Sequence, residues 1–125
     1  MRDTKIVELR PELDLDLAAS NEVETFQNQT LRPILKLQHE LLTQIFKHYI
    51  VQRKNTFNGQ SKIQKLEYIA HSVKNDLNFK NRLMGIVIGH FTVSEYEKYL
   101  TDEAELARRL VNLLVQRLQS EVNTL

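Results

Sequence analysis

Gln38, His39 and Glu40 are the consecutive side chains of this sequence best suited to chemistry. Gln38 falls near the middle of the apolar arc of a helix expected over residues 31–52, and a buried amide must find hydrogen-bond partners. His39 could take up or release a proton near neutral pH. The three residues therefore predict a polar pocket, although no nucleophile or second carboxylate stands at a spacing that would assist His39. The alternative for Gln38 is a role in fixing helix register, or a side chain that reaches the helix edge.

Metal and cofactor chemistry find little support in the sequence. The chain has four histidines and no cysteine, which excludes thiolate nucleophiles, disulfides and cysteine-based zinc or iron–sulfur sites. It also has no HExxH motif and no glycine-rich phosphate-binding loop. We therefore expect no metal and no cofactor. A non-catalytic protein is the leading prediction, and a small-molecule or metal-binding enzyme with a pocket around Gln38 and His39 is one alternative.

The middle of the chain is basic. Residues 47–82 carry eight lysines and arginines against two acidic residues, whereas the net charge of the whole chain is only +1. This segment predicts weak, salt-sensitive attraction to polyanions such as nucleic acids. The candidate anion-binding residues are Lys54, Lys62, Lys65 and Lys74. Specific nucleic-acid recognition is not expected, because the cations are spread over several helices and the flanking segments are acidic.

The segments that contain these residues have the sequence pattern of helices. Apolar residues recur at intervals of three and four along most of the chain, which predicts an all-α fold: a single-domain bundle of four to five helices. Three helix starts are marked by capping pairs, which are Asn21 with Glu24, Ser61 with Gln64, and Thr92 with Glu95. Gly89 is expected to end the helix before the last of these pairs, in a left-handed conformation.

The first 20 residues have a different pattern from the rest. From residue 7 to residue 17 apolar and charged residues alternate, so we expect residues 1–20 to form an extended N-terminal arm and residues 21–125 to form the helical domain. Pro33 should break or kink the helix that starts after Asn21, and Thr30 could cap its restart.

The last helix, from about residue 103, has apolar residues over about 200° of its circumference. Either this helix lies at the centre of the bundle, or its second flank meets another subunit. The candidate interface residues are Leu106, Leu113, Val115 and Leu118. The leading prediction is therefore an interaction or regulatory module that forms a homodimer, with an unknown protein partner as a further possibility.

The composition indicates a globular cytoplasmic protein without a membrane span. Apolar residues make up 42% and charged residues 26% of the 125 residues, as in ordinary globular domains. The first residues are charged and lack the apolar core of a signal peptide. The longest uncharged stretch of note, residues 83–94, is about half the length of a membrane span.

Residues 25–36 read TFQNQTLRPILK, and they are followed by residues 85–89 with two glycines, by Phe91-Thr92 and by Glu95-Tyr96. In these features the chain resembles a family of small bacterial all-helical proteins of unknown function, and the resemblance covers most of the chain. A glyoxalase label on some relatives is not supported, because glyoxalases resemble one another in βαβββ modules with metal ligands on strands. The resemblance implies an all-helical fold and carries over no functional residues.

Overall fold

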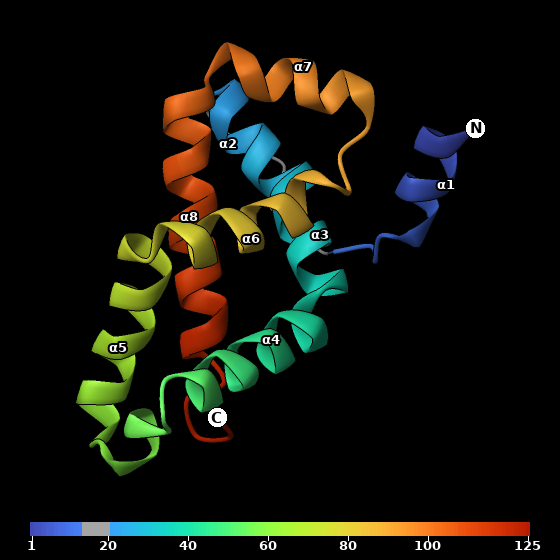
Figure 1. Cartoon of the computed structure of the whole chain (residues 1–125). Helices are drawn as coiled ribbons and strands as arrows, with labels where there is room; N and C mark the ends of the chain where they lie inside the picture. The colour runs from blue at the N-terminus through green and yellow to red at the C-terminus, as the bar shows by residue number, and fades with distance from the viewer. Residues whose placement is uncertain (14–20) are drawn as a thin grey trace.

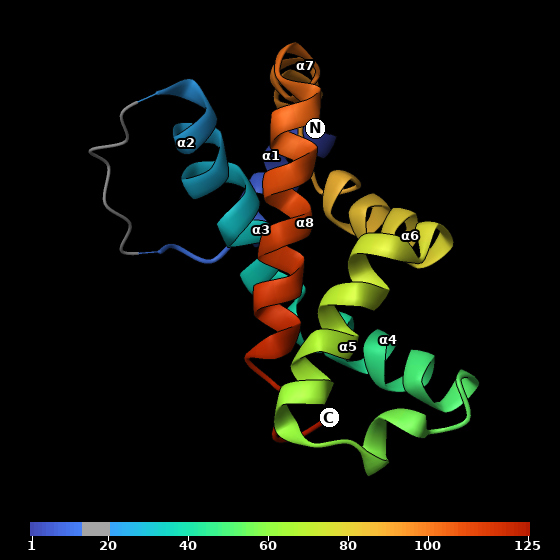
Figure 2. The same ribbon diagram turned by 90° about the vertical axis from the view of Figure 1, so that its left-hand side faces the viewer.

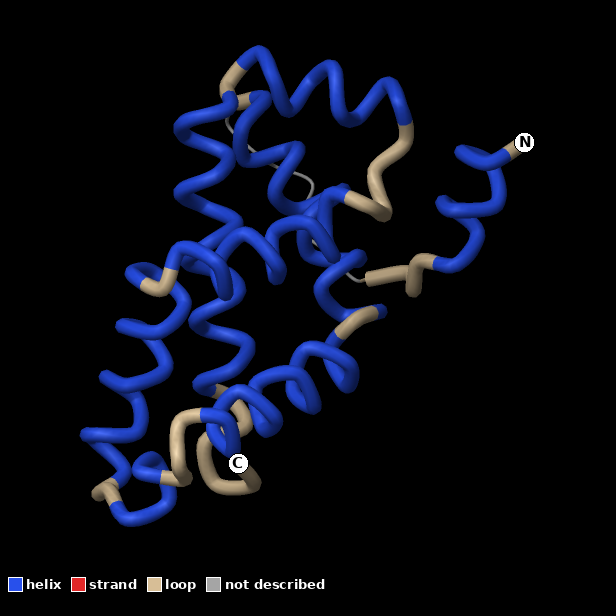
Figure 3. Tube along the Cα trace, viewed as in Figure 1, coloured by secondary structure: helices blue, strands red, loops and turns tan. Residues whose placement is uncertain are grey.

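The structure is a computed structural model that describes residues 1–13 and 21–125. Of these residues 80% are helical and none lies in a strand, so the all-α prediction is confirmed (Figure 3). The elements are α1 (Arg2–Leu9), α2 (Glu22–Phe26), η1 (Gln27–Leu31), α3 (Arg32–Leu37), α4 (His39–Gln52), η2 (Thr56–Gly59), α5 (Lys62–Asn75), α6 (Leu77–Ile88), α7 (Val93–Thr101) and α8 (Glu103–Gln119). Because α2, η1 and α3 are continuous and η2 is only a short 3₁₀ turn, the described residues form seven helices, more than the four to five predicted.

The last helix, α8, runs through the middle of the molecule (Figures 1 and 2). It contacts α3, α4, α5, α6, α7 and η1. Its buried residues are Leu106, Leu110, Val111, Leu113, Leu114, Val115 and Leu118. The wide apolar arc is therefore the mark of a central helix, and the four predicted interface residues are covered by the chain's own helices.

The capping residues named from the sequence start the helices as predicted. The side chain of Asn21 accepts the N–H of Glu24 at 2.8 Å. Both reciprocal bonds of a capping box are present at Ser61 and at Thr92. Gly89 follows the last residue of α6, but its backbone is right-handed, with φ −60°. The prediction of a left-handed conformation was therefore wrong.

The N-terminal segment is not an extended arm over its first residues. Arg2–Leu9 form α1, which has Asp3 in its first turn and buries none of its residues. Acidic residues stabilise the first turn of a helix, and only three residues of the alternating pattern fall inside α1. Arg10 is extended, as expected for the residue before Pro11. The rest of the predicted arm, residues 14–20, and its boundary with the helical domain lie outside the described residues.

Pro33 does not interrupt the helix that begins at α2. The preceding turn, η1, widens into a π-helix, which accommodates the missing proline N–H without ending the helix. The break instead falls at Gln38, where the backbone takes φ −94° and ψ 5° between α3 and α4. The predicted single helix over residues 31–52 is therefore two helices, which run in different directions (Figure 1). None of the helices in the described part of the chain is long and apolar enough to cross a membrane.

Candidate functional site

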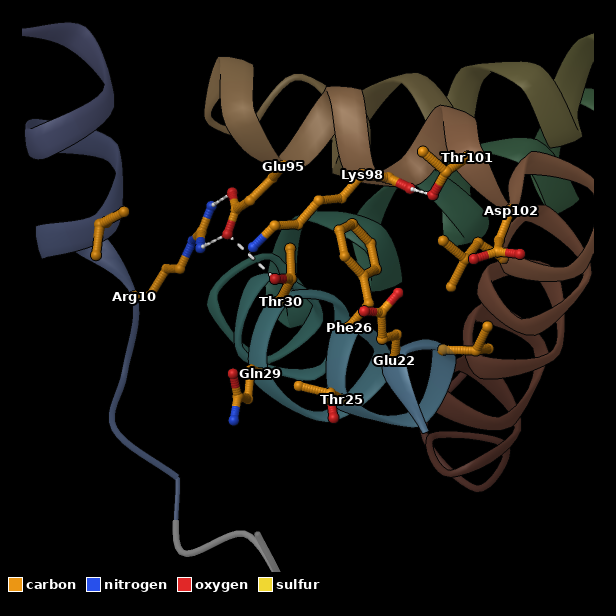
Figure 4. Close-up of a pocket in the computed structure, with 13 residues that line it drawn as sticks. Arg10, Glu22, Thr25, Phe26, Gln29, Thr30, Glu95, Lys98, Thr101 and Asp102 are labelled. Carbon is orange, nitrogen blue, oxygen red and sulfur yellow. Dashed lines mark hydrogen bonds and ion pairs between the residues drawn. The ribbon is translucent and has the colours of Figure 1, made fainter. Parts of the chain in front are cut away.

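A pocket of about 660 Å³ opens between α2, α7 and the start of α8, beside the N-terminal segment (Figure 4). This volume lies within the range of known small-molecule sites, roughly 300 to 1,000 Å³. Its lining residues are Val7, Arg10, Glu22, Val23, Thr25, Phe26, Gln29, Thr30, Glu95, Lys98, Thr101, Asp102 and Leu106. They come from parts of the chain that are far apart in sequence, so the pocket exists only in the folded protein.

The apolar surface of the pocket is held in place by aromatic packing. The ring of Phe26 meets Phe91 edge-on, with centroids 5.5 Å apart, and lies 6.4 Å from Tyr99. These contacts fix the end of α2 against α7. The π-helical turn follows directly and presents Gln29 and Thr30 to the pocket. Widened helical turns of this kind are frequent at functional sites.

One end of the pocket is closed by an ion pair between Arg10 and Glu95. Arg10 donates from Nη1 to Oε2 and from Nη2 to Oε1, both at 2.7 Å. The side chains are only 8% and 17% exposed. Thr30 donates its hydroxyl to the same carboxylate at 3.1 Å, and the N–H of Thr92 donates to it at 2.8 Å.

The environment of Glu95 keeps this carboxyl group ionised. Burial alone would raise its pKa, but the hydrogen bonds from Arg10, Thr92 and Thr30 outweigh burial and hold the pKa below its ordinary value. A carboxylate with these four donors is a poor general acid or base at neutral pH. The ion pair of Arg10 and Glu95 therefore has a structural role in the pocket.

The remaining charges of the pocket are separated. Lys98 extends along the pocket with its amine directed toward Thr30, whereas Glu22 and Asp102 lie at the other end, beyond Phe26 (Figure 4). Within residues 1–13 and 21–125, none of these three side chains forms an ion pair. The pocket thus offers a positive end, an apolar middle and a negative end.

The N-terminal segment, residues 1–10, forms hydrogen bonds with the corner between α6 and α7. Arg2 donates to the carbonyls of Phe91 and Gly89, both at 3.0 Å. Arg10 donates to the carbonyl of His90 at 2.6 Å, and Asp3 accepts the N–H of Val93 at 3.1 Å. These contacts leave no pattern in the sequence, because each partner lies more than 75 residues away.

Gln38 and His39 are placed apart from this pocket and from each other. The amide nitrogen of Gln38 contacts Nε2 of His90, while Nε2 of His39 lies 2.8 Å from Glu121. Gln38 lies at the break between α3 and α4 and His39 is the first residue of α4, so the two neighbours reach different partners. Glu40 is exposed and forms no hydrogen bond or ion pair with another described residue. The structure therefore does not gather the three residues around one cavity.

His90 is the more unusual histidine. Its Nδ1 is buried without a hydrogen-bond partner in the described part of the chain. Burial lowers its pKa, and the positive charges of Arg10 and Arg2 lower it further. His90 is therefore neutral at pH 7. The sequence pattern singles out Gln38 but not its partner His90, which lies 52 residues further along.

The four candidate anion-binding lysines do not form one patch. Lys54 lies in the turn after α4 and Lys62 at the start of α5, and both are exposed. The ammonium of Lys65 lies 5.3 Å from the ring centroid of Phe57. Lys74 lies near the far end of α5, about 18 Å along the helix axis from Lys62. Charges at this spacing cannot converge on one phosphate group.

Among the described residues, no three histidine, aspartate or glutamate side chains come together in a way that would hold a metal ion. Comparisons of the chain with protein-family models, with curated proteins and with solved structures found no match. The resemblance to a bacterial all-helical family therefore stays a prediction.

Proposed function

We propose that the protein is a non-catalytic binding module whose pocket takes up a small zwitterionic molecule with an apolar body, such as a short peptide. The observation that carries the proposal is the separation of charge in the lining: Lys98 at one end, Glu22 and Asp102 at the other, and Phe26 between them. A peptide carboxylate would meet the lysine, and its ammonium group would meet the two carboxylates. The volume of about 660 Å³ has room for a short peptide.

The chemistry of the lining favours binding over catalysis. Glu95 is already held by Arg10, Thr30 and Thr92, and the uncharged polar groups of the lining are threonines and a glutamine. A hydroxyl nucleophile needs a neighbouring base that is free to take its proton. Thr30 donates to Glu95, but Arg10 holds that carboxylate with two hydrogen bonds. Neither Thr25 nor Thr101 donates a hydrogen bond to a carboxylate or histidine. This supports a module that binds its ligand without converting it.

Calorimetry with free and blocked peptides tests the proposal. The probes are Leu-Leu and Leu-Leu-Leu, each compared with its N-acetylated and its C-amidated form. A charge-assisted hydrogen bond contributes about 1.5–3 kcal/mol, so blocking either end should weaken binding about tenfold or more.

A matched pair of variants locates the binding. Lys98→Met keeps the aliphatic stem and removes the charge, so it should weaken the free peptide but leave the C-amidated peptide unchanged. Lys36→Met removes an exposed charge of α3 outside the pocket and should change neither. No heat of binding with any probe, or equal losses in both variants, would show that the pocket is not a peptide site.

The homodimer and the cytoplasmic location remain part of the proposal, and α7 supports the dimer better than α8 does. Val93, Tyr96 and Leu100 recur at three and four residues on α7, and each is more than two-fifths exposed. Such a stripe is an ordinary surface for a second copy. Sedimentation at micromolar concentration should give a dimer that Tyr96→Glu weakens and that Leu77→Glu, an exposed change on α6, does not. A monomer would remove this part of the proposal.

A further inference from the structure

A second depression lies on another part of the molecule and shares no residue with the pocket described above. Its volume is about 230 Å³, and it lies between α3 and the last turns of α8. Its lining residues are Arg32, Leu35, Leu113, Gln116, Arg117 and Ser120. The fold thus brings two arginines, 85 positions apart in the sequence, to the same small cavity.

Neither arginine has an acidic partner in the part of the chain that the structure describes. Arg32 donates from Nε to the side-chain oxygen of Asn28 at 3.1 Å. Nη1 of Arg117 lies 3.4 Å from Nδ1 of His39. The nearest acidic residue in sequence, Glu121, is already engaged by His39 at 2.8 Å and by Thr124 at 3.1 Å. Two positive charges therefore face the depression without neutralisation.

The electrostatic cost of this arrangement is visible at Arg117. Its pKa is lowered, first by burial and then by the positive charge of Arg32. Like charges held near each other in a half-buried site are unfavourable. Most arginines of the protein avoid this cost by pairing, as Arg10 does with Glu95 and Arg108 with Glu105.

We infer that the depression between α3 and α8 binds a phosphate group, as inorganic phosphate or as a small phosphate monoester. Arginine donates in a planar fork that matches phosphate oxygens, and two such groups can neutralise a dianion. The amide of Gln116 adds a further donor, and Leu35 and Leu113 provide an apolar wall for the carbon part of an ester. The C-terminal end of α8 opposes an anion with about half a negative charge, which two full positive charges outweigh.

Thermal unfolding of the full chain at matched ionic strength provides the first test. Sodium phosphate, glycerol 3-phosphate and sodium chloride are compared at pH 7.5. Both phosphates should raise the melting temperature above its value in chloride, since a ligand that binds only the folded state stabilises it. A larger rise with glycerol 3-phosphate assigns the site to a monoester, and a larger rise with inorganic phosphate assigns it to the free ion.

Three variants decide whether the two arginines are responsible. Arg32→Gln and Arg117→Gln should each lower the affinity for phosphate, measured by calorimetry, at least tenfold. Arg108→Gln removes the same charge from an exposed position of α8 and should keep the wild-type affinity. In chloride alone, Arg32→Gln should melt no lower than the wild type, because it removes the repulsion from Arg117. The variant therefore stays folded for the binding measurement.

Two results would overturn the inference. One is a wild-type melting temperature that is the same in phosphate and in chloride at matched ionic strength. The other is an affinity for phosphate that Arg32→Gln lowers no more than Arg108→Gln does.

Discussion

α8 buries seven of its residues among the helices around it, whereas α1 buries none. The first helix is nevertheless attached, because the side chains of Arg2, Asp3 and Arg10 form hydrogen bonds with the corner between α6 and α7. One end of the chain is thus held by apolar area, and the other by a few directed polar contacts.

The two kinds of attachment differ in how they fail. Burial of apolar surface is non-directional and weakly sensitive to salt, so α8 should come apart only when the whole protein unfolds. Charged hydrogen bonds depend on geometry and on ionisation. A segment held in this way can open locally at a fraction of the total free energy of unfolding. Because Val7 and Arg10 line the pocket between α2 and α7, opening of this segment would also open the pocket.

The largest effect is expected in α8. Leu114 is fully buried, so Leu114→Ala should lower the free energy of unfolding by about 2–5 kcal/mol through lost burial and the cavity left behind. Leu9→Ala makes the same truncation in α1, where the side chain is 59% exposed, and should cost less than about 0.5 kcal/mol. Urea unfolding of both variants measures the difference. Equal losses of unfolding free energy in the two variants would show that α8 and α1 are not held in different ways.

The next effect concerns the ion pair of the N-terminal segment. Arg10→Ala removes both bonds to Glu95 and should weaken the docking of α1 by about 1.5–3 kcal/mol. Hydrogen exchange should then quicken at the amides of residues 5–10, while the amides of α8 keep their protection. Lys5→Ala is the matched control, because Lys5 is an exposed cation of α1. Faster exchange throughout the chain would show that the segment does not open separately.

The sequence predicted those parts of the fold that depend on neighbouring residues. The caps at Asn21, Ser61 and Thr92 act within one helical turn, so the residue types are sufficient to locate them. The wide apolar arc of α8 was visible too, but the choice between a central helix and a subunit interface depends on the positions of the other helices. No proline or glycine marks the break at Gln38, so the sequence does not predict it.

The candidate sites were harder to predict for the same reason. Arg10 is one arginine among many in the sequence, and its importance comes from Glu95, 85 residues away. The pair of Arg32 and Arg117 also depends on the packing of α3 against α8. Gln38 was recognised as a polar residue on an apolar face, and its contact with His90 explains the position. Long-range pairs such as these leave no pattern in a single sequence.

A smaller effect should connect the N-terminal cap of α7 with the docking of α1. Thr92→Ala removes the hydroxyl that accepts the N–H of Glu95 at 3.1 Å, which should cost about 1 kcal/mol. Because Glu95 also accepts two hydrogen bonds from Arg10, we expect part of this loss to appear as faster hydrogen exchange in α1. Thr101→Ala, at the exposed end of the same helix, should leave the exchange of α1 unchanged. An unchanged α1 in Thr92→Ala would show that the cap and the ion pair are independent.

The smallest expected effect is a dependence of the docking of α1 on pH, carried by His90. The pKa of His90 lies below its ordinary value of 6.5 while Arg2 and Arg10 lie beside it in the buried corner. When the segment opens, burial decreases and both arginines move away, so the pKa rises toward 6.5. The open state then binds more protons than the docked state, and docking weakens as the pH falls through 6.5. Above pH 7.5 His90 is neutral in both states, so docking should not change.

Hydrogen exchange of α1, corrected for the intrinsic rate at each pH, measures this effect between pH 7.5 and pH 5.5. The lower limit keeps Glu95 ionised, because its pKa lies below 4.5. His90→Gln removes the titration and should flatten the dependence, whereas His48→Gln changes an exposed histidine of α4 and should keep it. A dependence that survives in His90→Gln would assign the pH response to another group. A response of the expected sign would mean that protonation of one histidine loosens the end held by charges while the end held by apolar area stays in place.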